Sequence, residues 1–333
     1  MKTQNMFKTV TMTLIMLTLL SCKLSSQENK TPTITKTFDL NQPGTLNAQS
    51  SGGGIDVLEH ERNEVEIQVF IRKNGKLLSQ SDDMVDEILE DYDLDFSKNG
   101  SDITAIVKRK SHNKPLNNVG ISLTILVPRE MSCSISSSGG GIKISGVKGT
   151  HNFSSSGGGV KLANVAGTTR VGSSGGGVRV SNYTGDIDIS SSGGGVSVDD
   201  ATGSIVAHSS GGGVHLDNIH GTVDAGSSGG GVKISGELAS VKASSSGGSV
   251  HVDVSNLTKE LSLHSSGGGV DAVIHNGKNL GLDLDLSSER VNIELHNFTG
   301  KSEKNCIKGS MNGGGIPFYI RSSGGSVDVE FVD

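Results

Sequence analysis

Residues 157–174 read GGGVKLANVAGTTRVGSS, residues 175–192 read GGGVRVSNYTGDIDISSS, and residues 193–210 read GGGVSVDDATGSIVAHSS. Each segment has the same length and opens with three glycines. Repetition at a fixed period determines the fold, because each repeat then forms one structural unit of the same kind. Glycine runs spaced by 18 residues begin at Gly139, Gly157, Gly175, Gly193, Gly211, Gly229 and Gly247. Less regular copies begin at Gly52, Gly267, Gly313 and Gly324.

The repeat alternates between aliphatic and polar residues. With the first glycine as position 1, positions 4 and 6 are aliphatic in all seven regular repeats, as in Val178 and Val180, and position 5 between them is polar or charged. This period of two predicts a strand whose positions 4 and 6 face a core. Positions 13 and 15 predict a second inward pair, at Ile187, Ile189, Ile205, Ala207, Val223, Ala225, Val241 and Ala243.

Glycine also recurs at position 11, between the two predicted strands, where a turn with positive φ favours it. These glycines are Gly149, Gly167, Gly185, Gly203 and Gly221. A unit of two short strands cannot bury its apolar face alone, whereas stacked units bury it against one another. The sequence therefore predicts an all-β chain wound as a parallel β-solenoid of 18-residue coils, each rising by about 4.8 Å.

The N-terminus has the order of an export signal. Lys2 and Lys8 precede the apolar run VTMTLIMLTLL at residues 10–20, and Ser21 and Cys22 follow it. The run is too short to span a bilayer as a helix. Residues 19–22 (LLSC) resemble a bacterial lipobox, so we expect residues 1–21 to be a lipoprotein signal peptide and Cys22 to be acylated. The alternative is an ordinary signal peptide cleaved nearby, with Cys22 incidental.

The mature chain divides into regions that differ in how regularly the 18-residue repeat occurs. Residues 22–35 are polar and predict a flexible tether, and residues 36–131 predict irregular coils with strands near 64–72, 102–108 and 121–127. Residues 132–269 contain the regular repeats, and residues 270–333 predict irregular coils that cap the stack. One helical insert is expected near 81–92, within SQSDDMVDEILEDY, with Ser81 as a candidate N-cap.

Composition limits the possible partners. Removing residues 1–21 deletes two lysines and no acids, so the formal net charge changes from −6 to −8. Phosphate binding needs concentrated basic charge, so we expect no nucleic acid partner. Cys133 and Cys306 are the only cysteines after Cys22. We expect two buried thiols there, although export makes a disulfide possible.

The order of features resembles a bacterial family of β-strand-repeat domains described as "putative adhesins". An early coil, SSGGGIDVLEHERNEVEIQV, an acidic helical insert and the phrase ISLTILVPREMSCSISSSGGGIKISGVKG carry the likeness over residues 33–333. The resemblance implies a right-handed β-helix at the cell envelope and supplies no catalytic residues.

Several chemistries do not fit the sequence. The glycine runs open strands and lack the Gly-Lys-Ser/Thr end of a P-loop, so we expect no nucleotide. Calcium-binding rolls need Asp where these turns have Ser and Gly. The histidines lack metal-ligand spacing; His215 and His251 lie two coils apart, and His208 and His264 are also more than one coil apart. No metal or cofactor is expected. Scattered acids, rather than paired catalytic carboxylates, are expected at Asp186, Asp188, Asp199, Asp200, Asp217 and Asp224.

Position 5 provides one candidate binding feature. Lys143, Lys161 and Arg179 occupy it in three consecutive repeats, where stacking sets them about 5 Å apart. Like charges at that separation repel unless something screens them. An anionic polymer could do so, or acids in neighbouring columns could.

Three functions remain open from the sequence. The favoured one is a non-catalytic envelope lipoprotein, an adhesin-like rod anchored by its lipid in the outer membrane, at the periplasmic or surface face, that contacts polysaccharide or protein. The second is a carbohydrate-active β-helix enzyme with a carboxylate pair in residues 33–131 or 270–333. The third is an envelope-stress or signalling accessory protein.

Overall fold

The structure, a computed structural model, describes residues 31–110 and 118–332. Residues 32–333 form one compact unit. Hydrogen-bonded pairing links the 25 strands of the described residues into one sheet, in which most pairs are parallel. Beside them lie an α-helix, α1 (Met84–Glu90), and one 3-10 turn, η1 (Gly277–Asn279). The described part of the chain is thus nearly all β.

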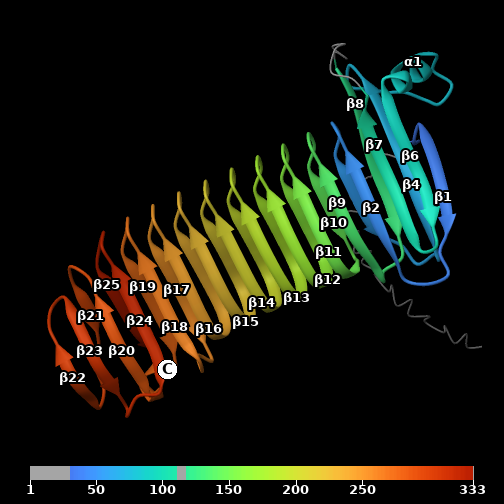
Figure 1. Cartoon of the computed structure of the whole chain (residues 1–333). Coiled ribbons are helices and arrows are strands. Elements are labelled where there is room, and N and C mark those ends of the chain that lie inside the picture. The colour runs from blue at the N-terminus through green and yellow to red at the C-terminus, as the bar shows by residue number, and fades with distance from the viewer. Residues whose placement is uncertain (1–30, 111–117, 333) are drawn as a thin grey trace, which may run out of the picture. The chain divides into compact units, whose positions relative to one another are not determined.

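The regular repeats stack in parallel, and their register is regular except between the last two long strands, where it shifts at Leu216/Ile219 and at Gly221/Thr222. Their strands are β10 (Ile142–Ser145), β11 (Lys148–Ser155), β12 (Val160–Ser173), β13 (Val178–Ser191), β14 (Val196–Ser209), β15 (Val214–Ser227) and β16 (Val232–Ser245). From β12 to β15, the residues that pair in parallel are 18 positions apart, as Val160 and Val178 are. Figure 1 shows these strands side by side in chain order.

Each regular repeat from β12 to β16 is one bent 14-residue strand rather than two short ones. The first bend lies at position 8, where the backbone is left-handed at Asn164, Asn182, Asp200 and Asn218, with φ between 52° and 58°. Asn and Asp tolerate this conformation better than other side chains. The amide of Asn182 also donates to Oδ1 of Asn164 over 3.1 Å.

The second bend lies at position 11. Positive φ is confirmed at Gly167, Gly185, Gly203 and Gly221, with values of 116° to 137°. Gly149 is not among the residues with positive φ. Its backbone therefore departs from the conformation that the repeat pattern predicts.

The predicted inward columns are confirmed, because the residues at positions 4, 6, 13 and 15 named above are at most 3% exposed. Burying an aliphatic side chain of this size contributes about 1.5–3 kcal/mol. A further inward column at position 9 was not predicted. It comprises Val147, Val165, Tyr183, Ala201 and Ile219, all at most 1% exposed. The core is thus lined by three stretches of each repeat rather than two.

Serine at position 17 is buried at the corner before the glycines. The Ser209 hydroxyl donates to the Gly194 carbonyl of the preceding corner over 2.8 Å and accepts the Gly212 N–H of its own corner over 3.1 Å. The same links recur at Ser227 and Ser245. The first serine of each Ser-Ser pair therefore ties one repeat to the next, and the second faces outward.

The glycine corner is crowded by backbone. A Cβ on Gly175 would lie 2.4 Å from the Gly157 carbonyl oxygen, and one on Gly176 would lie 2.4 Å from the Gly159 nitrogen. Neither glycine has a positive φ. Close approach of successive repeats, rather than an unusual backbone conformation, therefore requires glycine at this corner.

The N-terminal part mixes parallel and antiparallel pairs. Its strands are β1 (Ile34–Asp39), β2 (Gly44–Ser50), β3 (Ile55–Glu59), β4 (Glu64–Lys73), β5 (Lys76–Leu77), β6 (Tyr92–Asn99), β7 (Asp102–Arg109), β8 (Val119–Val127) and β9 (Met131–Ser137). β2 and β3 lie parallel to β9 and β10, so the early glycine copy at Gly52 stacks on the copy at Gly139. β4 runs antiparallel to β1, β5 and β8, and β6 runs antiparallel to β7.

The C-terminal part closes the stack with β17 (Val250–Ser255), β18 (Glu260–Ser265), β19 (Val270–His275), β20 (Leu282–Ser287), β21 (Val291–Ile293), β22 (Phe298–Ser302), β23 (Cys306–Met311), β24 (Ile316–Ser322) and β25 (Val327–Val332). The copy at Gly324 stacks on the copy at Gly267. Gly313 differs from both, because Gly313, Gly314 and Gly315 all have positive φ and form the turn before β24. Counting Gly313 as a repeat copy is therefore wrong.

The helix is shorter than the segment predicted for it. α1 begins at Met84, and Asp83, not Ser81, is its N-cap and makes no side-chain cap bond. Val85 and Ile88 are buried, whereas Met84 is 39% exposed. Among the described residues, no helix combines the length and apolar character needed to cross a membrane.

The described residues include the end of the segment expected to be tether, and Thr33 within it is buried. The Thr33 hydroxyl is buried, donates to the Leu78 carbonyl over 2.7 Å and accepts the Ile71 N–H over 3.1 Å. Residues 1–21 and Cys22 lie outside the described residues.

Gly175→Ala should destabilise the stack by about 2–3 kcal/mol, because the new methyl group meets backbone that cannot move aside. Gly52→Ala is the matched control, since it is the same change at the same repeat position with no atom within 4 Å of the new Cβ. Thermal unfolding followed by circular dichroism measures both. Equal midpoints for the two variants would contradict the crowding argument.

Candidate binding groove

A shallow groove of about 600 Å³ crosses four consecutive repeats. It is lined by the glycine corners and by positions 4 and 5, from Gly141 to Ser197. Lys143, Lys161 and Arg179, the cations singled out from the sequence, all lie along it. The structure therefore brings the predicted stripe together at one hollow of the surface.

The hollow follows from the glycine repeat. Positions 2 and 3 carry no side chain, so the backbone itself forms one side of the groove at Gly158, Gly159, Gly176 and Gly177. No larger residue fits there, because a Cβ on Gly159 or Gly177 would approach a carbonyl oxygen of the next repeat within 2.6 Å. The packing requirement that imposes glycine thus also opens the groove.

Register aligns the three cations across β10, β12 and β13. Lys143 pairs with Lys161, and Lys161 pairs with Arg179, so their Cα atoms follow one another at strand spacing, about 4.8 Å. Lys143 Nζ lies 3.3 Å from Asp56 Oδ2 on β3. Within the described residues, the Lys161 and Arg179 side chains make no hydrogen bond or ion pair.

The nearest outward column supplies no acid to these cations. Position 7 follows position 5 on the same face and holds Ser145, Ala163 and Ser181 in the three cationic repeats. Acids enter this column only from the next repeat on, at Asp199 and Asp217. The acids that were one explanation for screening the stripe are therefore absent from its neighbouring column.

A second hollow of about 450 Å³ lies on the same positions farther along the stack. His215 and Lys233 line it, together with Gly213, Gly231 and Ser249. Its position 7 neighbours include Asp217, whose Oδ1 accepts the hydroxyl of Ser235. An acid therefore flanks this hollow at its first repeat, whereas the first groove meets an acid at position 7 only in its last repeat, at Asp199.

Of the aspartates expected to be scattered, Asp199 and Asp217 are register partners at position 7 of neighbouring repeats, whereas the other four lie at positions 8, 12 and 14. Asp188 Oδ2 accepts from Arg170 Nε over 3.4 Å, and Asp199 accepts from the Ser197 hydroxyl over 3.2 Å. Asp200 occupies the left-handed position 8 and accepts from the Asn218 amide over 2.6 Å. These local partners give three of the acids structural surroundings rather than a shared site.

In the part of the chain that the structure describes, no group of three or more His, Cys, Asp or Glu residues is arranged so that it could hold a metal ion. His275 instead faces Asp253, with Nε2 2.8 Å from Oδ1. Cys133 and Cys306 are free thiols. Cys133 is buried, and desolvation raises its pKa to about 12, so it stays protonated. Cys306 is only half-buried, which corrects the expectation of two buried thiols.

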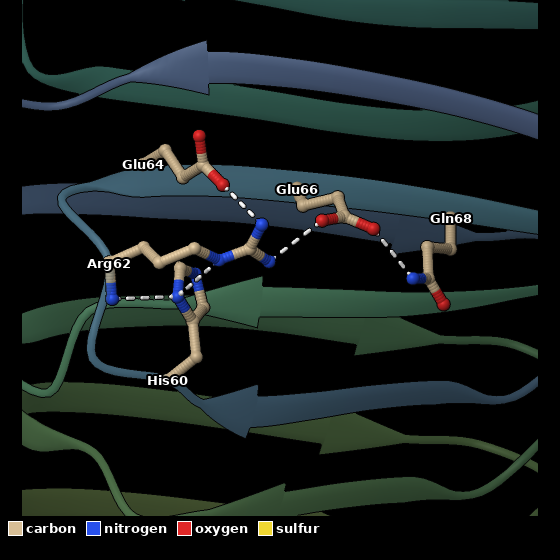
Figure 2. Close-up of polar contacts among 5 residues, drawn as sticks. All are labelled: His60, Arg62, Glu64, Glu66 and Gln68. Atoms are coloured by element: carbon tan, nitrogen blue, oxygen red, sulfur yellow. Dashed lines mark hydrogen bonds and ion pairs between the residues drawn. The ribbon is translucent and has the colours of Figure 1, made fainter.

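An ionic network lies at the turn between β3 and β4, in the irregular N-terminal part (Figure 2). The Arg62 guanidinium contacts Glu64 at 2.6 Å and Glu66 at 2.8 Å, and His60 Nδ1 accepts the Arg62 backbone N–H over 3.0 Å. Gln68 and Arg62 both donate to Glu66 and lower the pKa of its carboxyl group. The network satisfies its own charges and fastens the turn.

A pocket of about 370 Å³ adjoins this turn, where β9 begins. Glu59, Glu61 and Glu130 line it, together with His60 and Arg129. Glu130 also forms an ion pair with Lys148, at 3.2 Å. This pocket is where the irregular segment gathers carboxylates, and the sequence pattern did not reveal it because its residues come from non-repeating turns.

Polar groups occupy the inward position 13 near the start of the stack, a feature that the sequence analysis missed. His151 pairs in register with Cys133 on one side and with Thr169 on the other. The His151 ring is 2% exposed, stacks on Phe153 with 5.6 Å between ring centroids, and neither ring nitrogen has a hydrogen-bond partner. Desolvation lowers the pKa of His151.

Solved bacterial structures similar to this chain include proteins described as adhesins. A "putative adhesin" from Bacteroides fragilis has 12% identity and a TM-score of 0.36, covering 89% of this chain and 96% of that one. A "putative cell adhesion protein" from Clostridium sporogenes has 13% identity and a TM-score of 0.23, over 90% and 98%. A "putative lipid binding protein" from Parabacteroides distasonis has 12% identity and a TM-score of 0.27, over 92% and 98%. No family model and no curated protein matches the sequence.

His151→Ile should stabilise the protein by about 1–3 kcal/mol near pH 7, because it removes buried nitrogens that lack partners and fits a position that Ile187 fills two repeats later. The wild-type protein should lose stability as the pH falls below 6.5, the ordinary pKa of histidine, since the unfolded chain then binds a proton that the buried ring resists.

Thermal midpoints measured between pH 5 and pH 8 check both points. His151→Ile should flatten the acid side of the profile, whereas the exposed control His208→Gln should leave it unchanged. A profile equally steep in His151→Ile and in wild type would rule out His151 as its source.

Proposed function

We propose that this chain is a non-catalytic, lipid-anchored protein of the bacterial cell envelope whose stacked repeats provide an adhesin-like binding and scaffolding surface. In this proposal the repeats wind as a right-handed β-solenoid, the usual hand of parallel strand crossovers. Acylated Cys22 holds the mature chain on the outer membrane, at its periplasmic or surface face, and residues 23–32 act as the tether.

The open groove lined by Lys143, Lys161 and Arg179 is the observation that carries this proposal. It extends over four repeats, is lined by backbone and outward side chains, and contains no carboxylate or histidine. A surface of this kind holds a partner through charge and shape repeated along its length. It offers no nucleophile beside a general base, the arrangement that bond-breaking chemistry requires.

The anchor is supported by the N-terminal sequence. The apolar run at residues 10–20 ends next to Ser21 and Cys22, and polar residues follow. A single acyl chain binds membranes only marginally, whereas several chains on one terminus bind firmly. A multiply acylated Cys22 would therefore keep the protein at the membrane without a spanning helix.

Cys22→Ser should move the protein from the membrane fraction to the soluble fraction of its own cells, because the acceptor for acylation is lost. Fractionation with metabolic labelling by palmitate measures both changes. Cys306→Ser, the same substitution at a free cysteine far from the N-terminus, is the control that should remain labelled. Unchanged membrane association of Cys22→Ser would contradict the anchor.

The pocket lined by Glu59, Glu61 and Glu130 supports a second candidate function, a carbohydrate-active enzyme. Glycoside hydrolysis uses two carboxyl groups, one as acid and one as base or nucleophile. The pocket holds carboxylates in the irregular N-terminal part, where loops can build walls. The groove and this pocket therefore predict different consequences of mutation.

Deletion of residues 157–192 removes two whole repeats and joins positions of equal register, so the shortened chain should still fold. We expect the immobilised wild-type protein, without its signal peptide, to retain envelope material from its own cells and the deletion variant to retain much less. Folding is checked by circular dichroism. Equal retention would contradict a binding surface on the repeats. Turnover of an envelope glycan that is lost in Glu59→Gln would establish the enzyme instead.

A further inference from the structure

We infer that the groove from Gly141 to Ser197 binds a linear acidic polysaccharide that lies across the strands, along the stacking direction, with its carboxylate or sulfate groups at Lys143, Lys161 and Arg179. The inference rests on the proposed function, because it names the ligand of the same surface.

Two of the three cations are unpaired. Asp56 lies at the end of the column and contacts only Lys143, at 3.3 Å. Lys161 and Arg179 follow in register, are exposed, and contact no acid among the described residues. Adjacent like charges held by register repel each other, so an anion from outside the protein would relieve the repulsion.

The charge pattern is local and opposes the overall charge of the chain. The mature chain carries a formal charge of −8, yet no acid faces the position 5 stripe at position 7 until Asp199. In the regular repeats where position 7 is acidic (Asp199, Asp217 and Asp253), position 5 holds Ser197, His215 and His251. On a surface without a ligand, nothing would separate basic and acidic side chains in this way. A groove that binds an anion requires this separation.

The shape of the groove selects the type of anion. Successive cations stand about 4.8 Å apart along the stack, comparable with the length of one sugar residue in an extended glycan. A flat anionic bilayer cannot enter a concave groove, and the negative net charge of the protein opposes its approach. Proteins that bind single-stranded nucleic acid combine a positively charged groove with aromatic side chains on which the bases stack. The lining contains none.

Binding of fluorescently labelled polygalacturonate and dextran sulfate to the mature protein, with neutral dextran as the blank, tests the inference. Lys161→Glu with Arg179→Glu should weaken binding at least about tenfold, because attraction becomes repulsion. Raised salt should weaken binding of the wild type. Lys161→Gln with Arg179→Gln serves as a milder variant, and circular dichroism checks that each variant folds.

Arg170→Glu with Lys242→Glu is the matched control. It changes the total charge by the same amount, but at position 14 of the repeat. Both residues form ion pairs there, and their side chains are 77% and 53% exposed. Exposed pairs of this kind contribute little to stability. Binding should remain within about twofold of wild type if the groove, and not total charge, holds the polymer.

A gain of function sharpens the test. Ser197→Lys with Asp199→Ser extends the stripe by one repeat and removes the first neighbouring acid, so affinity for both polymers should rise about threefold or more. A monomeric galacturonate probe should show no comparable gain, because it cannot span two repeats. An unchanged affinity for the polymers in this variant would contradict alignment of the chain along the stack.

The remaining outcomes separate the inference from the proposed function. Equal loss of binding in the control, or equally tight groove-dependent binding to phosphatidylglycerol vesicles, would overturn the polysaccharide assignment. Absence of binding to either polymer, combined with repeat-dependent retention of envelope material, would overturn the inference and leave the proposed function standing. Loss of that retention as well would remove both.

Discussion

The structure depends on backbone approaching backbone at one corner of every repeat. Gly175 and Gly176 lie where any side chain would collide with the preceding repeat, and buried serine hydroxyls bridge the same corner. The register of the strands is then fixed, because a shift by one residue would place the charged residues of position 5 in the core. The inward aliphatic columns then contribute most of the stabilising burial.

Much of this could be predicted from the sequence because the repeat fixes register. Alternation at positions 4, 6, 13 and 15 predicted four buried columns, which the structure confirms. The buried column at position 9 was not predicted, because its residues differ in size, as Tyr183 and Ala201 do. They also do not alternate with another apolar residue nearby. The left-handed Asn164 and Asn182 were missed because the turn glycine three residues later provided the more obvious signal. Gly313 shares the letters of the repeat but has positive φ, and composition cannot distinguish these conformations.

The candidate site could also be predicted only in part from the sequence. The spacing of Lys143, Lys161 and Arg179 was visible as an 18-residue period, and parallel pairing places them in one column. The hollow beside them depends on glycines that appeared to serve only a turn. Less could be predicted for the parts without a repeat. The antiparallel pairs of β4 and the pocket at Glu59 and Glu130 bring together residues that have no regular spacing in the sequence.

The two outlying glycine copies have a consequence for how such a chain can change. The copy at Gly52 stacks directly on the first regular repeat, and the copy at Gly324 stacks on the copy at Gly267, which itself stacks on the last regular repeat, so the array is bracketed by ends that share its geometry. Duplication or loss of one 18-residue unit would leave both junctions chemically identical. Slippage during replication of such a gene could therefore produce variants of different length that still fold, each with a glycine-lined surface of a different length.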